Sequence, residues 1–250
     1  MGQVQIFNFQ VTTRDIEGLT DARGESIKAM LDSDYSISVD SVRVILGYQV
    51  KTDISEKQAK SAIYDLFADP IIEFGSLNES LIDNKKLFPK LPEIAITVGF
   101  KPGVTDNAGQ AGLDGLTTIF PKASDKSQVS TTMTYLFWGV PNNISPTWLT
   151  SKLHNQMIER ASISDRKQCL NSKWPNLEFP ERPPLTEQPS ATVNLEVSDE
   201  ELIDISEKGL LALNLEEMKA IQANYRKPAV RSARKNLGLP ENAPTDAELE

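Results

Sequence analysis

Apolar residues along the chain follow two spacings, which alternate from one segment to the next. Residues 4–11 and 94–100 are apolar at about every second position, which is typical of half-buried strands. After the first of them, Asp21 is a plausible helix N-cap, and the apolar residues between 27 and 31 lie three and four positions apart. The pattern predicts helices packed on small sheets, an α+β fold.

Gly47 divides the apolar residues between 39 and 50 into two runs, which predicts two strands joined by a tight turn or bulge. Residues 55–58 form a capping box that opens a second amphipathic helix, and a short closing strand is expected near 71–74. The element order is then β-α-β-β-α. The same order is expected again, with a strand at 94–100, a helix at 106–120, a strand pair at 129–140 and a helix from Ser145.

Three short matches indicate an internal duplication, because they keep their order along the chain. They are Thr-Asp-x-x-Gly at 20–24 and 105–109, Ile-Ser at 54–55 and 144–145, and Ile-Glu at 72–73 and 158–159, at offsets of 85, 90 and 86. An offset this long exceeds the roughly 20 to 50 residues of a solenoid unit. We therefore expect a tandem of two β-α-β-β-α units, residues 1–80 and 90–166, arranged as a pseudo-twofold pair.

The chain changes character after the duplicated part. The prolines within residues 167–197 predict an extended linker, because proline removes backbone donors. Its aromatic residues Trp174 and Phe179 suit either docking on a neighbouring surface or exposure in a linker. Capping boxes that begin at Ser198 and Asn214 predict a small helical segment over residues 198–250.

A further capping box at 245–248 opens a helix two residues before Glu250. We therefore interpret the helical segment as truncated at its C-terminus and the chain as the front part of a longer protein. The segment is expected to be only partly ordered, because its apolar face at Leu213, Met218 and Ile221 would lack residues to pack on.

Charge and hydropathy limit the classes of partner. The 250 residues carry a net charge of -9, from 26 Lys and Arg against 35 Asp and Glu, which argues against nucleic acid or an anionic membrane. No apolar run approaches the roughly 18 residues that span a bilayer. The single cysteine, Cys169, cannot form an internal disulfide. We expect a cytoplasmic protein.

Residues that could carry catalysis are scarce. His154 is the only histidine, so neither a histidine-based metal site nor a Ser/His/Asp set is expected. The chain also lacks the glycine-rich motifs that cradle phosphates. We predict no catalytic residue, no cofactor-binding residue and no metal ligand in this chain.

The segment before the second repeat's first helix is the candidate contact site. Lys101 precedes the helix N-terminus, which suits an anion or a solvated lysine. Glycines at 109, 112 and 115 favour either a close approach to a partner or close packing on the sheet. The predicted partner-contact loop consists of Lys101, Gly103, Thr105, Asp106 and Gly109.

Four segments resemble one enzyme family in its own order. Residues 100–109 resemble the opening of the small accessory subunit of phosphoribosylformylglycinamidine synthase, and residues 69–73 resemble that subunit's closing motif. Residues 211–223 are similar to the linker domain of the large synthase chain, and residues 244–250 resemble the stretch ahead of its catalytic region.

The resemblance implies a ligase of purine biosynthesis that uses ATP and Mg²⁺ and takes ammonia from a glutaminase domain or subunit. Its accessory module is non-catalytic and pairs with a second copy, so this chain is expected to be inactive and to contact the remaining synthase domains and the glutaminase. Two departures are residues 16–19, which replace the Pro-Gly-Val of residues 102–104, and Gln156-Met157, which replaces a proline followed by an apolar residue.

A function of another class fits the same pattern. Two small α+β domains often hold an amino acid or a nucleotide between them, so the alternative is a regulatory ligand-binding module. Fold analogy does not separate the two interpretations.

Overall fold

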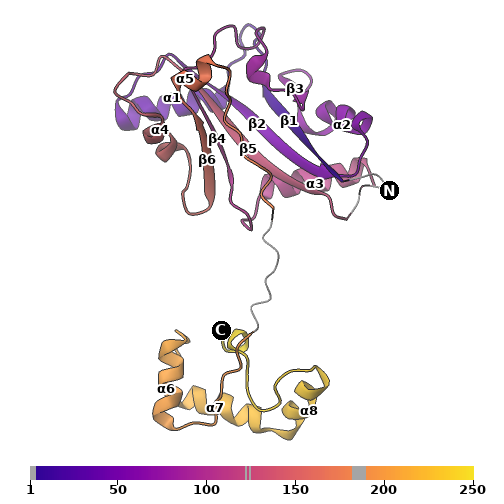
Figure 1. The fold of residues 1–250 in the computed structure, drawn as a ribbon, viewed down its shortest axis with the longest axis vertical. Helices are drawn as coiled ribbons and strands as arrows, with labels where there is room; N and C mark the ends of the chain where they lie inside the picture. The colour runs from indigo at the N-terminus through magenta and orange to yellow at the C-terminus, as the bar shows by residue number, and fades with distance from the viewer. Residues whose placement is uncertain (1–3, 122, 124, 182–189) are drawn as a thin grey trace. The chain divides into compact units, whose positions relative to one another are not determined.

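A computed structural model describes residues 4–121, 123, 125–181 and 190–250 of the chain (Figure 1). The residues fall into two compact units, Met1–Pro183 and Pro184–Glu250. The first unit contains a six-stranded, antiparallel, open sheet with helices, and the second is helical. The α+β class expected from the sequence is confirmed.

The sheet of the first unit has the strand order β3-β1-β2-β5-β4-β6. The strands are β1 (Gln5–Thr13), β2 (Ser41–Thr52), β3 (Glu73–Leu77), β4 (Ile94–Phe100), β5 (Gln128–Trp138) and β6 (Glu159–Ser164). The two long strands β2 and β5 pair at the centre, from Ser41 opposite Trp138 to Lys51 opposite Gln128. The first three strands therefore lie on one side of this ladder and the last three on the other.

The strand registers on the two sides of the ladder are related by a shift of 86 or 87 positions. Phe7 on β1 lies opposite Val50 on β2, and 87 positions later Ile94 on β4 lies opposite Phe137 on β5. The outer pairings, β1 with β3 and β4 with β6, correspond with shifts of 87 and 86. Positions that correspond by this shift are called equivalent below.

The predicted turn at Gly47 is wrong, and so is the predicted strand pair at 129–140. β2 runs without interruption through Gly47, and β5 is likewise one strand. Gly47 lies opposite Thr132, and a Cβ atom at Gly47 would come within 2.2 Å of the Thr132 Oγ1. The glycine thus makes room for a cross-strand side chain, and each half has the order β-α-β-α-β.

The helices between the strands pack against one face of the sheet (Figure 1). They are α1 (Ala22–Tyr35), α2 (Glu56–Ala62) with the π-helical turn η1 (Ile63–Phe67), α3 (Asn107–Ile119) and α4 (Pro146–Leu153). Successive residues of β2 separate the faces, because Val44 is buried against Leu31 of α1 while Ile45 packs in a different core on the opposite face.

The opposite face is covered by two segments that follow the closing strands. Residues 78–93 include the short 3₁₀-helix η2 (Leu81–Asp83), and the other segment begins with α5 (Arg166–Leu170). Leu81 and Cys169, one from each segment, are buried in the core of this face. The sheet thus lies between a layer of helices and a layer of largely irregular chain.

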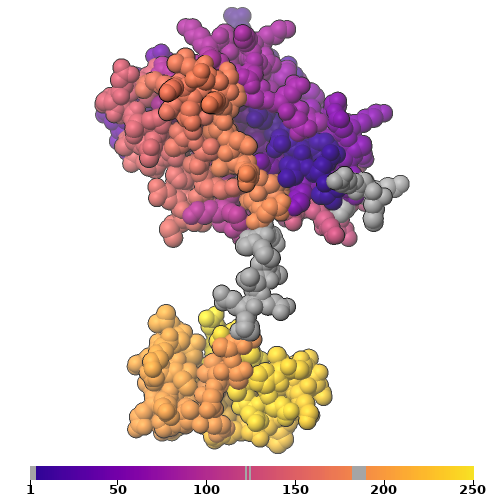
Figure 2. Space-filling view, in the orientation of Figure 1, coloured from indigo at the N-terminus to yellow at the C-terminus, as the bar shows by residue number. Residues whose placement is uncertain are grey.

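Part of the predicted linker over 167–197 belongs to this second layer. The Trp174 Nε1 donates to the Asp83 Oδ1 at 2.9 Å, and the Gln49 Nε2 donates to the Leu177 carbonyl at 2.8 Å. Figure 2 shows the segment, in orange, lying along the surface of the first unit. Docking through Trp174 is observed, whereas prolines 183, 184 and 189 of the predicted linker lie outside the described residues.

The second unit has a small core of its own. It contains α6 (Asp199–Lys208), α7 (Leu215–Arg226), α8 (Pro228–Asn236) and the short α9 (Asp246–Leu249). The predicted capping boxes at Ser198, Asn214 and Thr245 are confirmed. The expectation that Met218 lacks packing residues is wrong, because it is fully buried against Leu195 and Leu202.

One buried arginine ties the last helix of this unit to the preceding loop. The Arg234 Nη1 and Nη2 donate to the two carboxylate oxygens of Glu248, at 2.6 and 2.9 Å, and the Nε donates to the Pro240 carbonyl. The guanidinium also lies over the Tyr225 ring. Its hydrogen bonds, with those from Thr245, hold the pKa of the Glu248 carboxyl at about 2. The Glu248 carboxylate thus accepts hydrogen bonds both from Thr245 within the capping box and from Arg234 of α8.

We expect Glu248→Gln to lower the free energy of unfolding of the second unit by about 2 kcal/mol at pH 7, because charged hydrogen bonds to Arg234 are lost. In the unaltered chain this stabilisation is present above pH 4.5 and is lost as the pH falls toward 2, since the folded pKa of Glu248 is depressed. Amide hydrogen exchange of residues 190–250 at several pH values measures both effects. Asp204→Asn, which breaks the exposed pair with Lys208, should leave the stability nearly unchanged, because solvent screens this pair; an equal loss in both variants would contradict the prediction.

Candidate functional site

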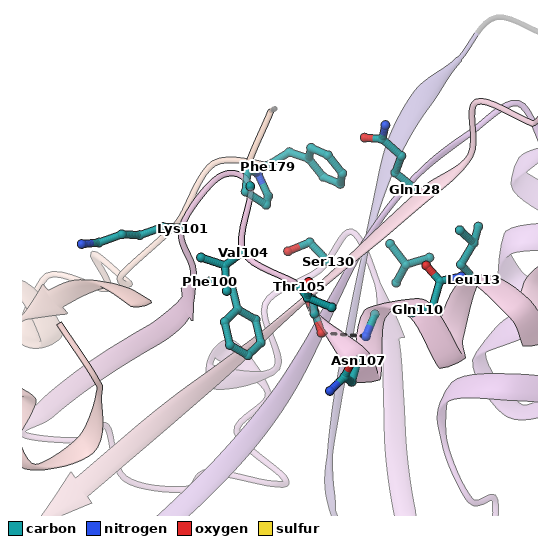
Figure 3. A pocket seen from close by; sticks show the side chains of 15 residues that line it. Phe100, Lys101, Val104, Thr105, Asn107, Gln110, Leu113, Gln128, Ser130 and Phe179 are labelled. Atoms are coloured by element: carbon teal, nitrogen blue, oxygen red, sulfur yellow. Dashed lines mark hydrogen bonds between the residues drawn. The ribbon is translucent and has the colours of Figure 1, made fainter. Parts of the chain in front are cut away.

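The predicted contact loop lines a cavity of about 220 Å³ at one end of the central ladder (Figure 3). Lys101, Gly103, Thr105, Asp106 and Gly109 all lie on its wall. The remaining lining comes from the first turns of α3, the start of β5 and the segment Phe179-Pro180. The structure therefore brings the predicted residues together, and whether they contact a partner stays a prediction.

Asp106 has a structural task that uses both carboxylate oxygens. Its Oδ1 accepts from the Gly109 amide at 2.7 Å and caps α3, while its Oδ2 accepts from the Thr131 amide of β5 at 2.6 Å. At the corresponding place in the first half, Asp21 accepts from the Gly24 amide at 3.1 Å and from the Val44 amide of β2 at 2.7 Å. The repeated Thr-Asp-x-x-Gly motif thus fastens a helix to the strand that follows it.

Gly109 permits this close approach of helix and strand. A Cβ atom there would lie 2.6 Å from the Val129 carbonyl oxygen, and at Gly24 it would lie 2.1 Å from the Val42 carbonyl oxygen. A Cβ at Gly115 would lie 2.4 Å from a methyl group of Leu66. Packing within the chain, rather than approach of a partner, accounts for the glycines at these positions.

The Lys101 side chain contacts another segment of the chain. Its Nζ donates to the Gln156 carbonyl at 2.7 Å, and Figure 3 shows its side chain directed away from the cavity. Gly103 adopts a positive φ of 86°, and a Cβ atom there would have no neighbour within 4 Å, so this glycine serves the turn between β4 and α3. The charged residues of the predicted loop are therefore both engaged within the chain.

The other side chains that line this cavity are neutral. Polar groups come from Thr105, Asn107, Gln110, Gln128 and Ser130, and apolar groups from Phe100, Val104, Leu113, Phe179 and Pro180. A lining of this kind suits amide groups and apolar side chains of a polypeptide more than a phosphate or a metal ion. Phe179 was missed as part of the site, because its place depends on docking of a segment about 70 residues away in sequence.

The residues with reactive side chains are also engaged elsewhere. The His154 Nδ1 lies 2.6 Å from the Thr150 carbonyl, within hydrogen-bond distance. Burial raises the pKa of the Cys169 thiol to about 11, which keeps it protonated near neutral pH. Among the described residues no group of three His, Cys, Asp or Glu side chains is placed to hold a metal ion. In the same part of the chain, no helix has the length and apolar character to cross a bilayer.

The sequence matches no protein-family model, and its comparison with curated proteins yields no match.

We expect Gly109→Ala to lower the free energy of unfolding of the first unit by about 1 to 3 kcal/mol, because the new methyl group would meet a backbone carbonyl. Gly112→Ala in the same helix is the matched control. Its Cβ would meet only ordinary contacts at 3.4 and 3.5 Å, so the higher helix propensity of alanine should stabilise by up to about 1 kcal/mol. Urea unfolding measures the free energy of unfolding of both variants. A similar change in the two would refute the packing role of Gly109.

Proposed function

We propose that this chain is the N-terminal, non-catalytic assembly part of a phosphoribosylformylglycinamidine synthase, a carbon-nitrogen ligase of purine biosynthesis in the cytoplasm. Its partners are the remaining synthase domains and a glutaminase domain or subunit. ATP and Mg²⁺ are bound elsewhere in the full-length enzyme. The sequence resemblance over residues 69–73, 100–109, 211–223 and 244–250 is the basis for the family named here.

The observation that carries the proposal is the equivalence of the two halves across the β2–β5 ladder. The resemblance implies an accessory module that pairs with a second copy, and a constant shift of 87 between the inner strand registers is what a fused pair requires. The shared roles of Asp21 and Asp106 support a tandem duplication further. Pairing β2 with β5 also covers two edges that the separate halves would expose.

Two equivalent turns provide surfaces for the partners. In residues 69–73 the first amide donates to the Glu side chain at 2.9 Å, and in residues 155–159 the corresponding distance is 2.6 Å. In both, the first side chain accepts from the amide two positions later. The replacement of proline by Gln156 therefore leaves the turn intact. Ile71 and Met157, at 76% and 82% exposure, stand out from these turns.

The expected lack of catalytic residues predicts, under this proposal, an inactive chain. The purified chain should neither hydrolyse ATP nor form the amidine product, with glutamine or with free ammonia, in a coupled ADP-release assay. The remaining synthase chain, assayed alongside with this chain added, serves as the positive control. Steady ammonia-dependent ATP turnover by a homogeneous sample of this chain alone would contradict the assembly role.

Binding to the partners should depend on the two exposed turns. We expect Ile71→Glu and Met157→Glu to weaken binding of the chain to the separately purified glutaminase and catalytic parts by at least about tenfold, because an apolar contact is replaced by a charge. Leu170→Glu, at an equally exposed leucine of the same unit, is the control and should change affinity less than about twofold. Surface plasmon resonance measures both, and equal affinities for all four chains would count against these turns as contact surfaces.

A further inference from the structure

A second, larger cavity lies at the opposite end of the central ladder. It has a volume of about 630 Å³ and lies where β2 begins and β5 ends. Its wall includes the charged side chains of Asp15, Asp40, Arg43 and Lys90 together with the Trp138 ring. In the first cavity, by contrast, the two charged wall residues, Lys101 and Asp106, are hydrogen-bonded within the chain. The two ends of one ladder therefore differ in chemistry.

A single pair of facing residues marks this difference. Beyond the pair Lys51–Gln128, Thr52 and Ser127 are buried, and their hydroxyls share a hydrogen bond of 2.9 Å that closes the ladder. The equivalent positions at the other end hold Gly139 and Asp40. Gly139 has a φ of 68°, and a Cβ there would lie 2.2 Å from the Asp40 Cγ. Loss of a side chain at Gly139 makes room for a carboxylate on the cavity wall.

Arg43 supplies a fixed positive charge on the same wall. Its Nη2 donates to the Thr13 carbonyl at 2.6 Å, its Nε lies 3.5 Å from the Asp21 carboxylate, and its guanidinium lies over the Phe88 ring. The equivalent residue on β5 is Ser130, which keeps the same register without a charge. The fold therefore does not require arginine at this position.

The other charged groups of the wall divide into engaged and available ones. Glu93 accepts from the Gly139 and Val140 amides and pairs with Arg166 at 3.2 Å, so it is occupied. Within the described part of the chain, the side chains of Asp15, Asp40 and Lys90 make no hydrogen bond or ion pair. Two carboxylates and one ammonium group remain available, next to the guanidinium of Arg43.

An apolar surface completes the cavity. The rings of Phe88 and Trp138 are stacked, with 6.2 Å between their centroids and an angle of 17° between their planes. The Trp138 indole N–H donates to the Lys90 carbonyl at 3.2 Å. Leu91, 39% exposed, lies on the same wall. A ligand with an apolar group would bury that group here while its charged groups meet the rim.

We propose that this cavity binds a free α-amino acid with an apolar side chain. The ammonium group is recognised by the carboxylates of Asp15 and Asp40, and the ligand's carboxylate by Lys90, with the positive charge of Arg43 on the same wall. A ligand with only one of these charges leaves the oppositely charged wall groups without a partner. The apolar side chain packs on Trp138 and Leu91. This site is independent of the assembly role.

Isothermal titration calorimetry on the full chain tests the proposal, with L-phenylalanine and L-leucine as probes. We expect saturable binding of at least one of them, and binding at least about tenfold weaker for 2-phenylethylamine and 3-phenylpropionate, each of which lacks one charge. Asp40→Asn, which keeps the shape of the side chain, should weaken amino-acid binding by at least about tenfold. Ser127→Ala, at the equivalent position of the other end, should leave the affinity within about twofold.

Three results would overturn the site: no binding of either probe at about 10 mM, equal binding of the two singly charged analogues, or equal losses in Asp40→Asn and Ser127→Ala. Lys90→Gln provides a second variant on an exposed side chain, so a folding defect in one variant does not end the test. Because the partners are absent from this titration, its failure would leave the assembly role untouched, and loss of partner binding would leave this site untouched.

Discussion

The antiparallel pairing of β2 with β5 is the constraint on which the rest of the first unit depends. Its register decides that Val42, Val44 and Val50 face the helices, and a slip of one residue would turn all three to the other face. The ladder also joins the two halves into one sheet. In either half alone, β2 or β5 would be an unpaired edge strand. One cavity lies at each end of this ladder, because its wall includes the residues at which β2 and β5 begin or end.

Local signals in the sequence predicted most of the helix starts, because a cap is made by residues only three positions apart. The boxes at Ser198 and Asn214 were accessible for this reason, and the α+β class was accessible from the spacing of apolar residues within each segment. Gly47 was misinterpreted because its neighbour across the sheet, Thr132, is distant in sequence, and a glycine in a strand pattern favours a turn when no partner is known.

The candidate site shows the same division. The five loop residues lie within ten positions of one another, so their proximity follows from the chain itself. Their hydrogen-bond partners do not follow from the chain itself. The bonds of Asp106 with Thr131 and of Lys101 with Gln156 join segments that only the folded sheet brings together. The second cavity left no sequence signal at all, since Asp40 and Gly139 are about 100 residues apart and ordinary in isolation.

The pair Asp40 and Gly139, set against Ser127 and Thr52, gives the molecule an internal reference. Each pair comes directly beyond the last paired residues at one end of the β2–β5 ladder, in the same molecule and the same solvent. Exchanging the two pairs within one chain would keep its amino-acid composition unchanged. Any change in the free energy of unfolding would therefore come from the local surroundings of the two pairs. The contribution to stability of an open ladder end with a carboxylate can thus be compared, inside a single molecule, with that of an end closed by a buried hydrogen bond.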